Sequence, residues 1–198
     1  MDIGCDPTLD CDDGGSRGQR VLRGARSALM RTGDDGTRLV VLRGPSGAGK
    51  SSAARALRRR AGRGVALVEQ DYLRRILLRE HDRPGGANIE LISNTVRFAL
   101  DRGFHVILEG ILSAARYGAM LRSLRDDHAG RSFFYYFDIS WSETLRRHAT
   151  RPKSAEFGAA EMSEWFDQAG RLDLVDERTV SETLTLDEIV GRIQREAF

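Results

Sequence analysis

One segment constrains the fold of this chain more than any other feature, and it reads Gly44-Pro45-Ser46-Gly47-Ala48-Gly49-Lys50-Ser51. It matches the pattern G-x-x-x-x-G-K-[ST] of the phosphate-binding P-loop, in which glycines let successive backbone N–H groups point at phosphate oxygens. Residues 38–43 before it form a short apolar run that predicts a strand, and residues 51–59 after it are strong helix formers. A strand, a glycine-rich loop and a helix in this order are typical of the P-loop unit of an α/β fold.

The chemistry of the P-loop residues predicts a bound nucleoside triphosphate with its metal. The backbone of residues 44–49 would cradle the phosphates, and Lys50 would reach the β- and γ-phosphate groups. Ser51 would bind Mg²⁺, and Ser52 lies beside it at the positive N-terminal end of the following helix. Only two of the 31 Lys and Arg residues are lysines, which favours a specific role for the compact ammonium group of Lys50. We take ATP with Mg²⁺ as the expected ligand.

Composition and charge limit the remaining possibilities. A chain of 198 residues, of which 40% are hydrophobic and 30% charged, is long enough for one globular domain with its own core. The formal net charge of +2 argues against a dedicated nucleic-acid-wrapping surface. We see neither an apolar run of membrane-spanning length nor a signal peptide, so we expect a cytoplasmic protein without a membrane partner. Residues 1–36, which contain both cysteines, Cys5 and Cys11, are expected to form a partly disordered extension.

Strand and helix patterns alternate from residue 37 to residue 198. Short apolar runs predict four further strands, at residues 65–69, 104–108, 133–139 and 178–181. Thr185 and Glu188 have the spacing of a capping box before a final helix. This alternation predicts a parallel sheet covered by helices on both faces, a three-layer αβα sandwich, whose ligands bind at the carboxyl ends of the strands.

Two acidic residues follow predicted strands and are candidates for the chemistry. Asp71 comes after the second strand, where it would accept a proton from a substrate hydroxyl group, cap the N-terminus of a helix at residues 72–80, or do both. Arg74 or Arg75 would then hold the acceptor. Glu109 ends the third strand, a Walker-B-like position from which it would hold Mg²⁺ through water or contact the substrate.

A basic pair follows the fourth strand. Arg147 and Arg151 are four residues apart, so they share one face of a helix that Pro152 would end. Their guanidinium groups would close over the triphosphate and stabilise the transferring charge, from a lid at about residues 147–170. A solvated basic face is the alternative in a chain so rich in arginine.

From about residue 38 to its end, the chain resembles the small P-loop kinases that phosphorylate hydroxyl groups. The stretch at residues 71–75 is similar to the aspartate-bearing strand end of polynucleotide 5′-kinases, zeta-type toxins and chloramphenicol phosphotransferases, which implies that Asp71 is the base. The stretch at residues 106–112 is similar to the corresponding strand of uridine kinases, and the arginine pair lies where such kinases keep a basic lid.

The sequence therefore predicts an ATP-dependent kinase that phosphorylates a hydroxyl group of a small-molecule or nucleoside-like acceptor. A polynucleotide 5′-hydroxyl kinase is an alternative, with a basic groove formed by Arg79, Arg83, Arg116 and Arg122. An ATP-binding switch that acts through a protein partner is another, with an apolar contact face formed by Phe157, Met162, Trp165 and Phe166. The chain lacks the Asn-Lys-x-Asp sequence of GTPases, the Leu-Ser-Gly-Gly-Gln signature of ABC transporter ATPases and the Asp-Glu pair expected of an AAA+ motor, which argues against these three classes.

Overall fold

The structure, a computed structural model, describes residues 31–149, 163, 166, 170–173 and 176–198 of the chain. These residues belong to one unit, Arg31–Phe198. Most of the extension predicted at residues 1–36 lies outside the described residues, as do Arg151 and most of the predicted lid.

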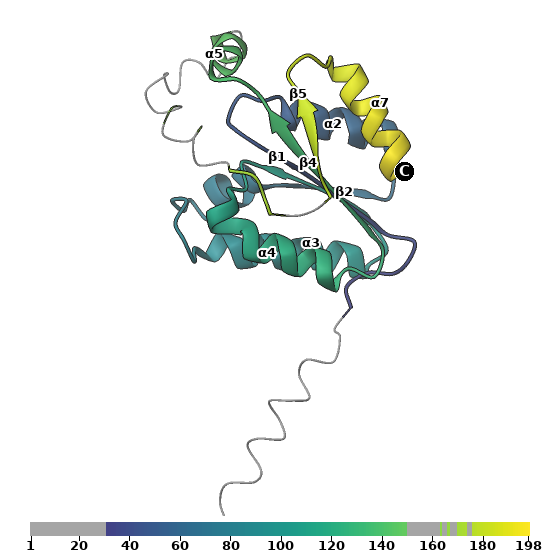
Figure 1. Cartoon of the computed structure of the whole chain (residues 1–198). Helices are drawn as coiled ribbons and strands as arrows, with labels where there is room; N and C mark the ends of the chain where they lie inside the picture. Colours follow the sequence, from purple (N-terminus) through teal and green to yellow (C-terminus); the bar gives the residue numbers. More distant parts are fainter. Residues whose placement is uncertain (1–30, 150–162, 164–165, 167–169, 174–175) are drawn as a thin grey trace, which may run out of the picture. The chain divides into compact units, whose positions relative to one another are not determined.

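A sheet of five parallel strands forms the centre of this unit (Figure 1). The strand order is β2-β3-β1-β4-β5, and the strands are β1 Arg38–Arg43, β2 Val65–Glu69, β3 His105–Gly110, β4 Arg131–Asp138 and β5 Glu177–Ser181. The predicted parallel α/β fold is confirmed, and each predicted strand end lies within two residues of an observed one. Because β1 is the middle strand, the P-loop that follows it lies at the centre of the carboxyl edge of the sheet.

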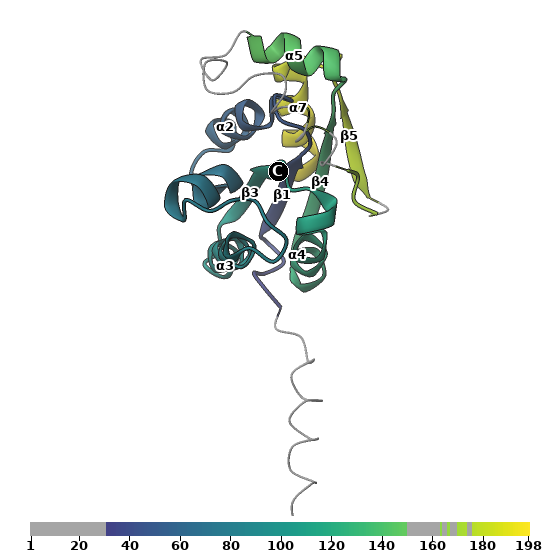
Figure 2. The same ribbon diagram turned by 90° about the vertical axis from the view of Figure 1, so that its left-hand side faces the viewer.

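Helices cover both faces of the sheet (Figures 1 and 2). On one face lie α2 (Lys50–Ala61) and α7 (Leu186–Ala197), and on the other lie α3 (Ala87–Asp101) and α4 (Ala114–Asp127). The capping box predicted for Thr185 and Glu188 is present at the start of α7.

The alternation of side chains along β1 explains why both faces need a helical layer. Val40 and Leu42 belong to a buried cluster with residues of α2 and α7, whereas Leu39 and Val41 belong to a second cluster with residues of α3 and α4. All four side chains are completely buried, which contributes roughly 1.5–3 kcal/mol for each of them. Strand residues alternate between the two faces, so an unbroken apolar strand has to be buried on both sides.

Two short helices extend the carboxyl edge: α5 (Trp141–Ala149) follows β4, and η2 (Tyr72–Leu77) follows β2. The helix predicted at residues 72–80 is in fact a π-helix of six residues. Asp71 before it has helical backbone angles (φ −63°, ψ −34°), and its side chain accepts no capping hydrogen bond. The prediction that Asp71 caps this helix is therefore wrong, because the chain already turns helically at Gln70 and Asp71.

A buried histidine joins two chain segments at the amino ends of the strands, opposite the carboxyl edge. His128 follows α4, and its Nε2 lies 3.0 Å from Thr37 Oγ1 while its Nδ1 lies 2.9 Å from Ser132 Oγ. Burial lowers the pKa of His128, so the fold accommodates the neutral ring. These two contacts fix the chain that enters β1 against the chain that enters β4.

Candidate active site

Three glycines give the P-loop its shape. Gly44, Gly47 and Gly49 have positive φ angles of 141°, 83° and 97°, a region in which other residues are strained by about 1–2 kcal/mol. At Gly44 a Cβ atom would also lie 2.7 Å from the carbonyl oxygen of Phe137 in β4. The loop therefore passes directly against the neighbouring strand before it turns into α2.

The N-terminus of α2 is arranged for an anion. The helix begins at Lys50, and its first turn, all of whose residues the structure describes, contains no acidic residue. Lys50 is buried, and its Nζ donates a hydrogen bond to the carbonyl oxygen of Pro45, 2.7 Å away. The N–H groups of a first helical turn and the helix dipole both favour negative charge at this position. Residues 44–52 therefore fit the phosphate groups that the sequence predicts for them.

Glu109 of β3 contacts the end of the P-loop. Ser51 Oγ donates a hydrogen bond to Glu109 Oε1 at 3.1 Å, so the structure brings together the two residues predicted to hold Mg²⁺. Glu109 is 5% exposed, and burial raises the pKa of its carboxyl group against the opposing effect of Lys50. Among the described residues, no three His, Cys, Asp or Glu side chains gather as a metal site. One hydroxyl and one carboxylate oxygen suit a Mg²⁺ ion that takes its other ligands from phosphate and water.

Asp71 lies beyond the end of the next strand. Strands β2 and β3 pair so that Glu69 is opposite Glu109, and Asp71 follows two residues later at the same edge. The Asp71 side chain is 55% exposed, and its negative charge is among the causes that raise the pKa of Glu109. A buried carboxyl group on β3 and an exposed one just after the adjacent strand β2 therefore lie at the same edge of the sheet as the phosphate-binding loop.

The two arginines after Asp71 have different environments. Arg74 Nη2 lies 2.9 Å from Asp71 Oδ1, and Arg74 Nη1 donates to the carbonyl oxygen of Glu80. Arg75 Nη1 lies 3.9 Å from Asp71 Oδ2, and the Arg75 side chain is 44% exposed, against 17% for Arg74. Arg74 therefore holds the orientation of Asp71, whereas Arg75 is the more exposed of the two predicted acceptor-binding arginines.

Arg147 of α5 reaches the P-loop. Its Nη1 donates to the carbonyl oxygen of Ala48 at 3.1 Å, and its Nη2 donates to the carbonyl oxygen of Glu182 at 3.0 Å. Its Nε donates to Glu143 Oε1 at 2.6 Å, and hydrogen bonds from Arg146 and Arg147 lower the pKa of Glu143 to about 2. The Arg147 guanidinium thus joins α5 and the loop before α7 to the phosphate-binding backbone.

A buried group of polar residues beneath the site was not predicted from the sequence. Leu112, between β3 and α4, has a φ angle of 44°. Its N–H donates to Gln70 Oε1 and its carbonyl oxygen accepts from Arg43 Nε, both at 3.1 Å. Arg43 also forms a buried ion pair with Glu177 of β5 at 2.8 Å. The only sequence signals for this group were an arginine at the end of an apolar strand and a glutamine beside Asp71.

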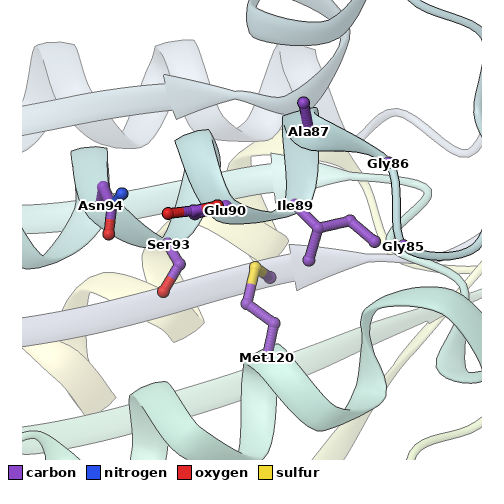
Figure 3. A pocket seen from close by; sticks show the side chains of 8 residues that line it. All are labelled: Gly85, Gly86, Ala87, Ile89, Glu90, Ser93, Asn94 and Met120. Atoms are coloured by element: carbon purple, nitrogen blue, oxygen red, sulfur yellow. The ribbon is translucent and has the colours of Figure 1, made fainter.

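A surface hollow of about 350 Å³ lies between α3 and α4 (Figure 3). Its lining consists of Gly85, Gly86, Ala87, Ile89, Glu90, Ser93, Asn94 and Met120. None of these described lining residues is one that the sequence predicts for phosphate, metal or acceptor binding. The groups suited to phosphoryl transfer therefore lie at the P-loop edge of the sheet rather than in this hollow.

The residues predicted for the basic groove are all described, whereas those predicted for the apolar contact face are described only in part. Arg116, from the predicted basic groove, pairs with Asp82 at 2.8 Å. Phe166, from the predicted apolar contact face, packs edge-to-face on Trp141 of α5 with 5.2 Å between ring centroids. The other members of that face, Phe157, Met162 and Trp165, lie outside the described residues. None of the helices in the described part of the chain is long and apolar enough to cross a membrane.

A five-stranded parallel sheet of order 2-3-1-4-5, with a P-loop after its middle strand, is typical of P-loop kinases. Within this class, the chain matches the AAA domain family (AAA_33) over residues 39–175, and it belongs to that family. The matched stretch includes the P-loop, Asp71, Glu109 and Arg147. The family is described as an AAA domain, whereas β3 has Leu108-Glu109 near its end and lacks the Asp-Glu pair expected of an AAA+ motor.

Solved structures with this fold include several kinases. The chain is similar to the APS kinase CysC of Mycobacterium tuberculosis in complex with AMPPNP and APS, with a TM-score of 0.63 and 21% identity, covering 82% of this chain and 96% of that one. It is similar to a sugar kinase from Janibacter sp. HTCC2649, with a TM-score of 0.63 and 16% identity, covering 80% of this chain and 93% of that one. It is also similar to a gluconokinase from Sinorhizobium meliloti 1021, with a TM-score of 0.57 and 17% identity, covering 84% and 96%. No curated protein matches the sequence, and at these identities the similar structures establish the fold.

Proposed function

We propose that this chain transfers the γ-phosphoryl group of ATP to a hydroxyl group of a small-molecule acceptor. The observation that carries the proposal is the hydrogen bond between Ser51 of the P-loop and Glu109, with Asp71 at the end of the adjacent strand. A phosphate cradle, two oxygen ligands suited to Mg²⁺ and an exposed carboxylate are the parts that this reaction requires.

The reaction would proceed as an in-line transfer. The acceptor oxygen forms a bond to the γ-phosphorus, the bond from that phosphorus to the β–γ bridging oxygen breaks, and its electron pair leaves with ADP. Asp71 accepts the hydroxyl proton and releases it to solvent. Residues 44–49 hold the phosphates, Lys50 neutralises charge on the leaving and transferring groups, and Arg147 keeps the loop in place through the Ala48 carbonyl group. Bound Mg²⁺ would neutralise charge on the β- and γ-phosphate oxygens, and Ser51 and Glu109 are the residues that would hold it.

Similar structures support the reaction class but do not name the acceptor. Three of them carry kinase names, and one contains AMPPNP and APS. The proposal also includes a lid at about residues 147–170 and an N-terminal extension, predicted at residues 1–36, whose residues 31–36 belong to the same unit as the sheet. A polynucleotide acceptor is the alternative, and of its predicted basic groove Arg116 is paired with Asp82.

The test is the transfer of labelled γ-phosphate from ATP with Mg²⁺ to a panel of nucleosides, sugars, hydroxylated antibiotics and 5′-hydroxyl oligonucleotides. Asp71→Asn should lower kcat by about 10²- to 10⁴-fold, the usual contribution of a general base, with little change in ATP affinity by calorimetry. Asp127→Asn is the matched control, because Asp127 is also a part-exposed aspartate bonded to an arginine (Arg97, 2.6 Å) but lies at the far end of α4. Lys50→Ala should lower both ATP affinity and turnover.

Three outcomes would count against parts of this proposal. Equal loss of ATP affinity and turnover in Asp71→Asn would make Asp71 a structural residue rather than the base. Full turnover in Lys50→Ala would refute the role of the P-loop. Turnover that appears only after a protein partner is added would favour the ATP-binding switch over the kinase.

A further inference from the structure

Exposed apolar side chains concentrate next to the candidate base. Tyr72, Ile76, Leu77 and Leu78 are all exposed, and Ile76 is exposed to 66%. They make up half of the large apolar residues that are exposed in the described part of the chain, although they lie within seven consecutive positions. Single exposed apolar residues are ordinary on a protein surface, whereas a contiguous group marks a site where something binds.

The π-helix places one member of this group, Ile76, on the same side as Asp71. The N–H of Leu78 donates to the carbonyl oxygen of Leu73 at 3.1 Å, the spacing of five residues that defines this helix type. Residues four and five positions after Asp71, which are Arg75 and Ile76, therefore lie one turn along the same side. The 3.9 Å approach of Arg75 Nη1 to Asp71 Oδ2 agrees with this register.

The opposite side of η2 accounts for its packing. Leu73 packs against the core cluster that contains α3 and α4, and Arg74 is mostly buried between Asp71 and the carbonyl group of Glu80. The helix is anchored by these two residues, so Tyr72 and Ile76 are not needed to hold it in place. An apolar surface that the described residues leave exposed therefore lies beside the carboxylate that the proposed reaction uses.

We infer that the acceptor is an alcohol carried on an apolar aromatic or aliphatic body, which lies on Tyr72 and Ile76 while its hydroxyl group meets Asp71. This inference rests on the proposed kinase function and narrows its substrate class. Sugars and nucleosides carry polar groups around most of their surface, and those groups need hydrogen-bond partners that hydrocarbon side chains do not supply. The transfer step is the one given above, with the proton passing to Asp71 and the electron pair to ADP.

The experiment compares acceptors that carry the same hydroxyl groups on different bodies: propane-1,2-diol against 3-phenylpropane-1,2-diol, and butane-1,4-diol against octane-1,8-diol. We expect the apolar member of each pair to have a kcat/KM higher by about tenfold or more, as burial of a ring or a four-carbon extension gives. Ile76→Ser should raise the acceptor KM for the apolar members by about tenfold, with kcat and the KM for ATP unchanged. Ile76→Val should keep most of the wild-type value.

Phe98→Ser is the matched control, because Phe98 is 63% exposed and lies on α3, outside η2. Equal kcat/KM values within both acceptor pairs would overturn the inference while leaving the kinase proposal intact. A change in Ile76→Ser that is the same for polar and apolar acceptors would also overturn it, and would indicate that another part of the chain or a partner covers η2.

Saturation-transfer NMR separates failure of the inference from failure of the proposed function. Binding of 3-phenylpropane-1,2-diol that is lost in Ile76→Ser but kept in Phe98→Ser supports the apolar site even where no acceptor is phosphorylated. Absence of that binding in the wild-type protein, together with phosphorylation of propane-1,2-diol, refutes the apolar site alone.

Discussion

Replacing Gly44 by alanine should destabilise the fold by about 3 kcal/mol, whereas the same change at Gly64 should cost about 1 kcal/mol. Both glycines have positive φ angles, 141° at Gly44 and 84° at Gly64. They differ in their surroundings. A Cβ atom at Gly44 would lie 2.7 Å from the carbonyl oxygen and 3.1 Å from the Cβ of Phe137, while one at Gly64 would meet nothing within 4 Å.

The magnitudes follow from two separable effects. A positive φ angle costs an alanine about 1–2 kcal/mol, and the smaller entropy of its unfolded chain returns about 0.4–1 kcal/mol, which leaves about 1 kcal/mol at Gly64. At Gly44 the overlap with Phe137 adds about 1–3 kcal/mol. It cannot be relieved locally, because the Phe137 carbonyl group belongs to the backbone of β4, which is paired on both sides.

Gly110→Ala isolates the second effect, because Gly110 has no positive φ angle. Its added Cβ would overlap Gln70 Oε1 and lie 2.6 Å from Gln70 Cβ. Gln70 would have to move away from the N–H of Leu112, and a buried donor left without its acceptor costs about 1–3 kcal/mol. We therefore expect Gly110→Ala to fall between the other two variants.

Equilibrium unfolding in urea, followed by circular dichroism, gives the three free energies of unfolding. The midpoint should fall with little change in the slope, because the folded and unfolded surfaces stay the same. A loss at Gly64 equal to that at Gly44 would refute the reasoning, since it would mean that φ alone, and not the approach of the P-loop to β4, requires glycine.

Two predictions concern buried titratable groups. Burial raises the pKa of Glu109, so its contribution to the free energy of unfolding should grow as pH falls from neutral toward the unfolded-state pKa near 4.5. Glu109→Gln should remove this pH dependence in urea unfolding and should weaken the Mg²⁺ dependence of ATP binding in calorimetry. The same slope of unfolding free energy against pH in the variant and the wild-type protein would contradict the prediction. Burial lowers the pKa of His128 and, at the same edge, of His105, so each contributes stability that is present above about pH 6.5 and lost as pH falls below it. His128→Gln should reduce the loss of unfolding free energy between about pH 7 and pH 5, and His105→Gln serves as the comparison. Identical curves of unfolding free energy against pH for His128→Gln and the wild-type protein would contradict the prediction.

The features that were predicted correctly from the sequence are each formed by residues that lie close together along the chain. A P-loop is defined by eight consecutive residues, and the Thr185–Glu188 capping box by four. The apolar residues of β1 predict a strand buried on both faces, as observed. The sequence left Asp71 open to two interpretations, a helix cap and a strand-end carboxylate, because the same residue type suits both. Only the backbone angles exclude the cap.

Contacts between residues far apart in sequence were beyond this kind of prediction. Arg43 and Glu177 are separated by 134 positions, and no local pattern relates a buried arginine at the end of one strand to a glutamate at the start of another. The exposed side of η2 was missed for a related reason. Its register depends on a five-residue hydrogen-bond spacing, whereas the sequence predicted an ordinary helix, in which a different set of residues would lie beside Asp71.

The two carboxyl groups at the site divide the proposed chemistry according to their environments. Glu109 is 5% exposed and bonded to the P-loop serine, so it is suited to hold a cation that is itself enclosed by phosphate. Asp71 is 55% exposed and braced by Arg74, so it is suited to take a proton from an incoming hydroxyl group and return it to water. A pair of acidic residues in different surroundings serves different roles, and exchanging their environments would leave neither role filled. In the proposed reaction the phosphate groups therefore lie beside the buried carboxyl group, while the acceptor lies beside the exposed apolar side of η2, which would select it.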